Sequence, residues 1–145
     1  MRCILQRVCE ASVSIDQRCV ARIAGGLLVL TGIAPGDDHS HAQRMLERIL
    51  GYRIFNDQAG RMNRNVVETG GGVLLVPNFT LMADTRKGMR PSFTSAAPPQ
   101  QARDLFEWMC ASAAQQHDDV AYGVFGADMQ VALVNDGPIT ITLEV

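Results

Sequence analysis

The sequence lacks the features that would assign it to a membrane, a secretory route or a metal site. It has no apolar run that approaches a bilayer span, and Arg7 falls where a signal peptide needs an uninterrupted apolar core. We therefore expect a soluble, cytoplasmic protein with no membrane contact. The four cysteines form no CxxC pair and no cluster with histidine, so we expect buried free thiols, no metal and no cofactor.

Familiar catalytic motifs are also missing. The chain has no Gly-x-Ser-x-Gly elbow, no glycine-rich phosphate loop and no His-Glu-x-x-His pair. His39, His41 and His117 lie in polar surroundings beside predicted helix ends, which favours exposed side chains; a Cys–His dyad is the less favoured alternative. Asp37-Asp38 and Asp118-Asp119 are interpreted as cap and turn residues. If the protein is an enzyme, its side chains do not reveal the acid–base catalyst.

The charge balance argues against a protein that coats nucleic acid. Thirteen basic residues face fifteen acidic ones, for a net charge of −2, so any RNA contact must be local. All basic residues but one are arginine, which suits bidentate phosphate contacts. Five of them fall within thirty residues: Arg61, Arg64, Arg86, Lys87 and Arg90. This cluster indicates either a phosphate-binding surface or a solvated loop with scattered charge.

The length and the apolar pattern predict one sheet-rich domain over residues 1–145. A hydrophobic content of 47% is sufficient for a core in a chain of 145 residues. Alternation over 4–9 and 12–16 predicts strands, and the continuous apolar runs at 27–30 and 73–76 predict strands buried on both faces. Weaker patterns predict further strands at 20–23, 52–55, 120–124, 129–134 and 139–145.

Two segments have helical periodicity. The first begins at Asp38 or Ser40 and ends at Gly51, and the second begins at Pro99. The second carries an inward stripe of Ala102, Leu105, Phe106, Met109, Cys110 and Ala113. Residues 82–98 between the helices lack periodicity and predict a long functional loop. The fold class is therefore a mixed α/β single domain with two main helices covering the sheet.

Two short segments are suited to chemistry by the backbone rather than by side chains. Asn78-Phe79-Thr80 follows a buried strand, so its N–H groups can leave the sheet and point at an oxyanion or carbonyl. Gly137-Pro138 lies between two strands, where glycine permits close approach of a ligand and proline holds a bend. A plain strand end and a tight turn explain the same residues, and the pattern alone favours that simpler interpretation.

Ordered matches along the whole chain go further than either segment. The matching segments are residues 6–8, 26–30, 53–57, 60–63, 78–81, 83–93, 123–129 and 134–140. In these segments the sequence resembles the D-aminoacyl-tRNA deacylase family. The resemblance implies a homodimer that hydrolyses D-aminoacyl-tRNA, and glycyl-tRNA, at active sites on the subunit interface. It also implies a cis Gly137-Pro138 bond that enters the partner's pocket and excludes L-aminoacyl groups.

The resemblance assigns roles to individual residues. The amides of Phe79 and Thr80 would hold the substrate carbonyl while the terminal ribose 2′-hydroxyl helps to position water; a nucleophilic Thr80 hydroxyl is the alternative. Phe125 and Met129 would pack on the terminal adenine, or else belong to the core. Arg7 would hydrogen-bond the Gly-Pro segment, or else form a surface ion pair.

The remaining assignments concern RNA and specificity. Arg86, Lys87 and Arg90 would contact acceptor-stem phosphates. Pro77-Asn78 stands where the family pattern has Ser-Gln, so one backbone donor is lost and the side chain at Asn78 is one methylene shorter. The substrate-binding role of Asn78 is therefore open to change. Two rivals follow: a related editing deacylase with altered amino-acid specificity, and a catalytically weak protein that binds tRNA ends.

Overall fold

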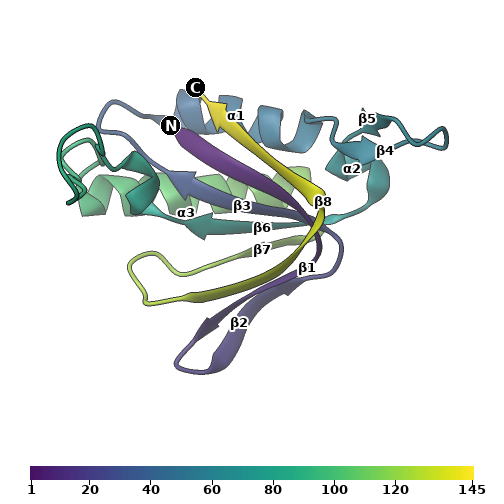
Figure 1. The fold of residues 1–145 in the computed structure, drawn as a ribbon, viewed down its shortest axis with the longest axis horizontal. Coiled ribbons are helices and arrows are strands. Elements are labelled where there is room, and N and C mark those ends of the chain that lie inside the picture. The colour runs from purple at the N-terminus through teal and green to yellow at the C-terminus, as the bar shows by residue number, and fades with distance from the viewer.

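The computed structural model describes residues 1–145 (Figure 1). Its elements are, in order, β1 (Arg2–Ile15), β2 (Arg18–Ile23), β3 (Gly26–Gly32), α1 (His39–Gly51), β4 (Phe55–Asn56), β5 (Met62–Arg64), α2 (Val66–Thr69), β6 (Gly72–Pro77), the 3-10 helix η1 (Phe79–Met82), α3 (Pro99–Gln116), β7 (Val120–Tyr122) and β8 (Gln130–Glu144). The main sheet is strongly bent, and α1 and α3 lie on one of its faces (Figure 1).

The long strand β1 organises the sheet. Residues 2–8 of β1 pair antiparallel with β3, residues 11–15 pair with β2, and β8 runs antiparallel along the other side of β1. β3, β6 and β7 are parallel, with α1 in the first crossover and α3 in the second. The carboxyl ends of β3 and β6 therefore lie together at one edge of the sheet.

Alternation within the buried strands builds two cores. In β3, Leu27 and Val29 belong to the larger core against α1 and α3, whereas Leu28 belongs to a smaller core on the opposite face. This explains the continuous apolar runs, because a strand covered on both faces needs an apolar residue at every position. The smaller core is bordered by half-buried Val131 and Leu133 of β8. That face of the sheet is therefore only partly covered.

Both predicted helices are confirmed. Asp38 is the N-cap of α1, and its Oδ1 accepts hydrogen bonds from the amides of Ser40 and His41. Pro99 is the first residue of α3, and all six residues predicted to face inward from this helix are buried. No helix in the protein is long and apolar enough to span a membrane.

Several elements differ from expectation, among them the short strand β5, which was not predicted. The short helix α2 was not predicted, because one turn carries no periodicity; a capping box between Asn65 and Glu68 holds it. The strand expected from Tyr52 begins only at Phe55: the Ile54 amide binds the carbonyl of Tyr52 within a local turn, and the Ile54 carbonyl accepts from Arg7. The strands predicted at 129–134 and 139–145 are one strand, β8, because both halves pair with β1.

The expectation of four buried thiols is wrong for two of them. Cys3 and Cys110 are buried, whereas Cys9 and Cys19 are exposed. Cys9 lies where the β1–β8 register shifts and the alternation of faces breaks, and Cys19 lies in β2, which pairs only with β1. Burial raises the pKa of Cys3 and of Cys110 from 9.0 to about 12.

Candidate functional site

The chain leaves β6 through the 3-10 helix η1, which exposes two backbone donors. The Asn78 amide still pairs with the sheet and donates to the carbonyl of Thr31 at 2.8 Å. The amides of Phe79 and Thr80 open the helix and have no acceptor within the chain. Of the three residues predicted to leave the sheet, these two present free, adjacent N–H groups.

No base is hydrogen-bonded to the Thr80 hydroxyl beside these amides, and Asp128, the carboxylate that shares a pocket with Thr80, makes no hydrogen bond to it. The Thr80 hydroxyl donates a hydrogen bond to Oδ1 of Asn78 and contacts no histidine or carboxylate. A threonine nucleophile needs a base to take its proton. The arrangement therefore favours the backbone, rather than the hydroxyl, as the reactive part of this segment.

Pro77 fits the end of β6 without loss of a sheet hydrogen bond. It pairs with Thr31 of β3 on one side, and its Cδ lies 3.4 Å from the position that a Cβ on Gly123 would take. β7 ends at Tyr122, so no strand continues opposite the nitrogen of Pro77. This location past the end of a neighbouring strand is one that tolerates proline.

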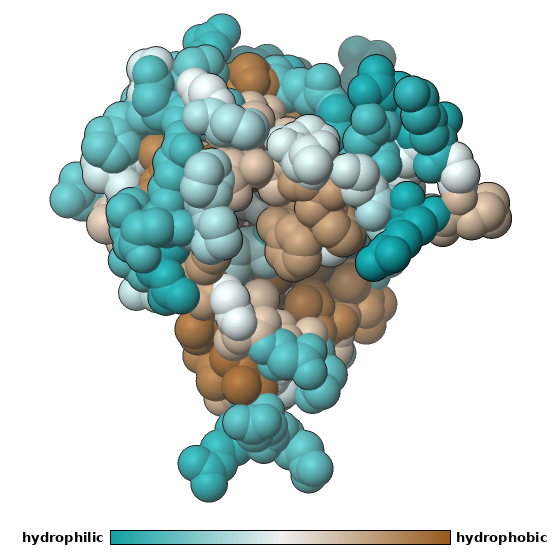
Figure 2. Space-filling view, turned by 90° about the vertical axis from the view of Figure 1, so that its left-hand side faces the viewer, coloured by the Kyte–Doolittle hydropathy of each residue, from teal (hydrophilic) through white to brown (hydrophobic).

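Two pockets meet at η1. The first, called here the apolar pocket, measures about 520 Å³ and lies between η1, the 82–98 loop and α3. It is lined by Thr31, Ile33, Pro77, Asn78, Phe79, Phe93, Ala96, Ala97, Pro98, Pro99, Ala102, Phe125 and Gly126. Figure 2 looks onto this end of the molecule and shows a hollow with mostly apolar surface beside and below it.

The second pocket, called here the Met129 pocket, measures about 430 Å³. It is lined by Leu30, Val76, Pro77, Asn78, Phe79, Thr80, Phe125, Gly126, Ala127, Asp128, Met129 and Val131. Phe79 and Phe125 line both pockets, whereas Met129 lines only the second. The structure thus brings together five of the predicted site residues: Asn78, Phe79, Thr80, Phe125 and Met129.

Sequence reasoning gave no role to Phe93, which the structure brings to the same site. Its ring packs edge-to-face on Phe79, with centroids 5.1 Å apart, and it lines the apolar pocket. Phe93 belongs to the irregular 82–98 loop, which has only one isolated bridge, between Asp84 and Ser92. An aromatic residue in a polar loop was the signal that could have identified it.

Gly137 and Pro138 form an exposed projection from β8. Their peptide bond is cis, and Gly137 has a φ of +139°, which disfavours an L side chain. In the ladder with β1, Asn135 pairs with Val8 and Thr140 pairs with Gln6, so the residues between them loop out of the sheet. The Asn135 side chain closes the loop, accepting from the amide of Ile139 at 2.7 Å and donating to its carbonyl at 3.1 Å.

Arg7 supports the base of this projection. Its Nε lies 3.2 Å from the Asp136 carbonyl oxygen and 2.9 Å from Asp136 Oδ2, and its Nη1 donates to the Ile54 carbonyl at 2.7 Å. Arg7 therefore binds the residue before Gly137 and not the Gly-Pro carbonyls themselves. It is buried, so it is not the surface arginine that the alternative interpretation described.

The projection and the two pockets do not meet within one chain. Arg7 lies opposite Leu27 in β3, whereas the chain at Asn78 binds Thr31, four residues further along the strand. Four strand residues span about 13 Å. Neither Gly137 nor Pro138 lines either pocket. The predicted site residues thus form two separate groups in one chain.

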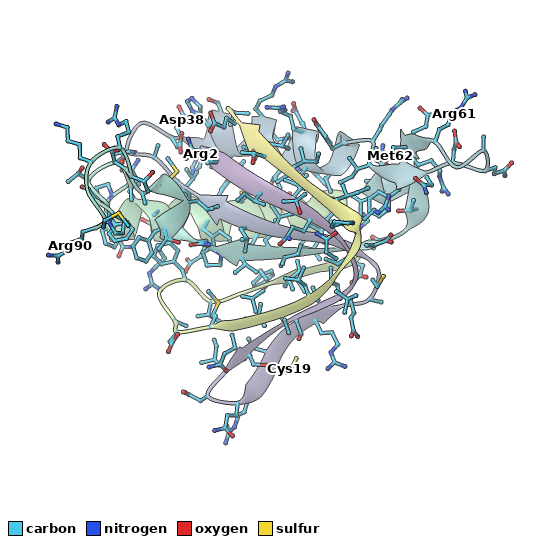
Figure 3. The ribbon with its side chains drawn as sticks, viewed as in Figure 1. Arg2, Cys19, Asp38, Arg61, Met62 and Arg90 are labelled. Atoms are coloured by element: carbon cyan, nitrogen blue, oxygen red, sulfur yellow. The ribbon has the colours of Figure 1, made fainter.

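The predicted phosphate-binding residues lie in the 82–98 loop, away from Arg61 and Met62 of the β5 region (Figure 3). Arg86 is already paired: its Nη2 lies 2.6 Å from Asp84 Oδ2, and its Nε donates to Asp84 Oδ1 at 2.9 Å. This contact lowers the pKa of Asp84 to about 2. Lys87 and Arg90 are exposed and have no carboxylate partner, so they are the more available cations of this loop.

The histidines have structural contacts outside both pockets. His39 stacks on Trp108, His41 completes the capping box of α1, and Nε2 of His117 lies 2.7 Å from the carbonyl oxygen of Gly71. None of them lines the apolar or the Met129 pocket. Fold and site together define a small α/β protein whose pocket is built from backbone amides and apolar side chains.

Comparison with known proteins identifies the family. The chain belongs to the family described as D-Tyr-tRNA(Tyr) deacylase, whose model matches residues 4–144. A D-aminoacyl-tRNA deacylase of Thioalkalivibrio sulfidiphilus is 57% identical over 145 residues, covering 100% of this chain and 97% of that protein. A protein of the same name from Azotobacter vinelandii is 54% identical, covering 99% of both.

Two solved structures share the fold. One, described as c-Myc DNA Unwinding Element Binding Protein, superposes with a TM-score of 0.96 at 34% identity, covering 100% of this chain and 99% of that one. The other is described as a probable eukaryotic D-amino acid tRNA deacylase, with a TM-score of 0.89, 14% identity, and coverage of 99% and 98%. At that identity the second structure shows the fold alone.

Proposed function

We propose that this protein hydrolyses the ester bond of D-aminoacyl-tRNA, releasing the free amino acid and tRNA, and that it also accepts glycyl-tRNA. The observation that carries the proposal is the pair of free amides at Phe79 and Thr80: both residues line the Met129 pocket, and Phe79 also lines the adjoining apolar pocket. The substrate class is supported by full-length relatives named D-aminoacyl-tRNA deacylase.

The two pockets suit the two parts of such a substrate. The apolar pocket, with aromatic Phe79, Phe93 and Phe125 in its walls, suits the terminal adenine, because single-stranded bases bind by stacking on aromatic side chains. The aminoacyl group then lies in the Met129 pocket, which Thr80 lines and where its amide has no acceptor within the chain. In this arrangement Phe125 separates the two groups, and Met129 contacts the aminoacyl side rather than the adenine.

The backbone supplies the catalytic stabilisation. The amides of Phe79 and Thr80 donate to the ester carbonyl oxygen, whose negative charge grows as water attacks the carbonyl carbon. Donors that are fixed before the reaction stabilise that charge, and the loss of one such donor typically costs about 10²–10³-fold in rate. The ribose 2′-hydroxyl of the substrate positions the water, since the Thr80 hydroxyl is engaged with Asn78.

The chiral filter comes from a second copy of the chain. Gly137-Pro138 is exposed, and within its own chain it is remote from the pockets. In a homodimer the projection of one subunit enters the Met129 pocket of the other, where its main-chain atoms occupy the space that an L side chain needs. The partly covered face of the sheet supports this pairing, because Val131 and Leu133 of β8 border the smaller core and are only half-buried. Phe79 of η1, at the Met129 pocket, is 56% exposed. The apolar surface continues beyond the hollow (Figure 2).

A hydrolysis assay with matched substrates tests the activity. Purified protein is expected to release D-tyrosine from D-tyrosyl-tRNA and to leave L-tyrosyl-tRNA intact. Binding of both without release would identify a tRNA-end binding protein instead. Cleavage of the L-ester at a comparable rate would identify an editing deacylase of other specificity. Sedimentation at micromolar concentration is expected to give a dimer, and a monomer would contradict a site shared between subunits.

The Pro77-Asn78 segment is where altered specificity would arise. The backbone amide of Asn78 donates to the Thr31 carbonyl, and the Asn78 side chain accepts a hydrogen bond from the Thr80 hydroxyl. A longer side chain at position 78 would therefore move that hydroxyl without changing the sheet. Asn78→Gln is therefore expected to retain hydrolysis of the D-ester. A D-to-L preference that rises strongly in this variant would show that the natural Asn78 relaxes chiral selection.

A further inference from the structure

Arg103 of α3 lies beside Phe125, which lines both pockets; Arg103 itself lines a neighbouring pocket of about 420 Å³, together with Phe125 and Glu107. Its guanidinium carbon is 5.3 Å from the centroid of the Phe125 ring. Its Nη2 is 3.5 Å from the position that a Cβ on Gly126 would take. Phe125 and Gly126 both line the apolar and Met129 pockets, and Ala102, the residue before Arg103, lines the apolar pocket. Two contacts, with the Phe125 ring and with the Gly126 position, thus locate this cation at the pocket rim.

The guanidinium of Arg103 is not bound by a carboxylate, although Glu107, one turn further along α3, lines the same neighbouring pocket. Arg7 and Arg86 both pair with aspartates, whereas the Arg103 guanidinium makes no ion pair and no hydrogen bond. The adjacent carboxylate of Asp104 instead accepts a hydrogen bond from Gln100 at 2.7 Å. A guanidinium over an aromatic face leaves its N–H edge free, and that edge matches the oxygens of a phosphate.

We propose that Arg103 binds the phosphodiester on the 5′ side of the substrate's terminal adenosine. The inference rests on the proposed function, in which the adenine occupies the apolar pocket. A nucleotide held by its base carries its 5′-phosphate out to the pocket rim, and Arg103 is the unpaired cation beside that rim. The contact distinguishes the 3′ end of an RNA from a free aminoacyl nucleoside, and it is independent of RNA sequence.

Equilibrium binding of two small probes tests the contact. Adenosine and adenosine 5′-methylphosphate differ only by a phosphodiester like that of RNA. The wild-type protein is expected to bind the diester about tenfold more tightly, in line with a hydrogen bond to a charged group. Arg103→Gln is expected to remove this preference and leave the affinity for adenosine unchanged. Arg103→Lys should retain part of the preference for the diester, since lysine keeps the positive charge but cannot donate two parallel hydrogen bonds to the phosphate.

Arg44→Gln is the matched control. Arg44 also lies on an exposed helix surface, but it pairs with Glu47 at 3.4 Å and lines neither pocket. This variant is expected to keep the full preference for the diester. With D-tyrosyl-tRNA as substrate, Arg103→Gln should raise KM about tenfold at unchanged kcat, and lower the slope of log affinity against log salt by about one.

Two outcomes would overturn the inference. Equal wild-type affinity for the two probes would mean that no phosphate is bound. An equal loss of affinity for both probes in Arg103→Gln would mean that Arg103 acts only by holding Phe125. Binding of the probes needs no turnover, so the result is separate from the activity. A protein that keeps the diester preference but releases no D-tyrosine would refute the proposed function while supporting the phosphate contact.

Discussion

Arg7 and Asp136 form an ion pair at the base of the Gly137-Pro138 projection, with Nε 2.9 Å from Oδ2. The arginine side chain is 9% exposed and the aspartate side chain 51% exposed, so the pair spans from the interior to the surface. The same guanidinium donates to the carbonyls of Asp136 and Ile54. One side chain therefore joins the projection to the segment that leads into β4.

Arg7→Leu is expected to destabilise the protein by about 2 kcal/mol, because it leaves two carbonyls at the base of the projection without their donor. Asp136→Asn keeps the backbone carbonyl that Arg7 binds, and it removes a half-exposed charge, so it should cost less than about 1 kcal/mol. Urea unfolding of both variants measures the difference. Equal losses would mean that the ion pair, and not the carbonyl contacts, holds the segment.

Removal of the Phe79 amide tests the backbone mechanism. Phe79→Pro deletes the N–H at the first position of η1, where proline is tolerated, and Asn78 (φ −144°, ψ 88°) lies outside the α region that a following proline disfavours. Phe79→Ala is the control, because it loses the same ring and keeps the amide. We expect kcat of Phe79→Pro to lie about 10²-fold below that of Phe79→Ala. Similar kcat values for the two variants would remove the amide from the mechanism.

Thr80→Ala distinguishes the hydroxyl from the backbone. The hydroxyl donates to Asn78 and has no base, so its loss is expected to leave hydrolysis of D-tyrosyl-tRNA within about threefold of the wild type. Loss of activity with unchanged tRNA binding would instead support a threonine nucleophile.

Two inactive variants are expected to complement each other if the site spans two subunits. A Cβ on Gly137 would lie 2.7 Å from Ile139 Cγ1, so Gly137→Val should distort the projection and abolish activity. Dimers reassembled from equal amounts of Gly137→Val and Phe79→Pro contain a hybrid with one intact site. The mixture should regain about a quarter of wild-type activity. No recovery in a mixture shown to contain hybrids would indicate that each chain forms its own site.

The amino group of Met1 is expected to contribute to stability through a buried ion pair. It lies 2.6 Å from Oδ1 of Asp37, and both groups are buried. Asp37→Asn should destabilise the protein by about 3 kcal/mol, since it leaves a buried charge without its partner. The exposed Asp118 provides the comparison: Asp118→Asn should leave the urea midpoint unchanged. Equal midpoints for the two variants would contradict the prediction.

The buried thiols predict a loss of stability in alkaline solution. The pKa of Cys3 and of Cys110 is raised from 9.0 to about 12 by burial, so the unfolded chain releases these protons first. Their stabilising contribution is complete below pH 9 and is lost as the pH rises toward 12. Cys3→Ala should flatten this decline, measured by urea unfolding between these limits. Cys19→Ala, at an exposed site, should leave the decline unchanged.

The sequence by itself determined the elements that depend on local burial. The inward stripe of α3 and the apolar runs at 27–30 and 73–76 were recognisable because a position that packs against a core carries an apolar residue. Both cores are continuous along these segments. The Asp38 cap and the Pro99 start were recognisable because both signals are local: the cap hydrogen bonds of Asp38 lie within one turn, and proline suits a first helical position, where no N–H is needed. The family pattern added which short segments belong to the site.

Only the tertiary structure decided how those segments meet. The register of β3 against β1 and β6 separates Gly137-Pro138 from Phe79 and Thr80. Contacts between residues far apart in the chain pair Arg7 with Asp136 and place Arg103 beside Phe125. Periodicity carries no information on such contacts, because it records how exposed a position is and not which residue covers it. The roles of the two backbone segments are predictions from the sequence, and their separation within one chain follows from strand register.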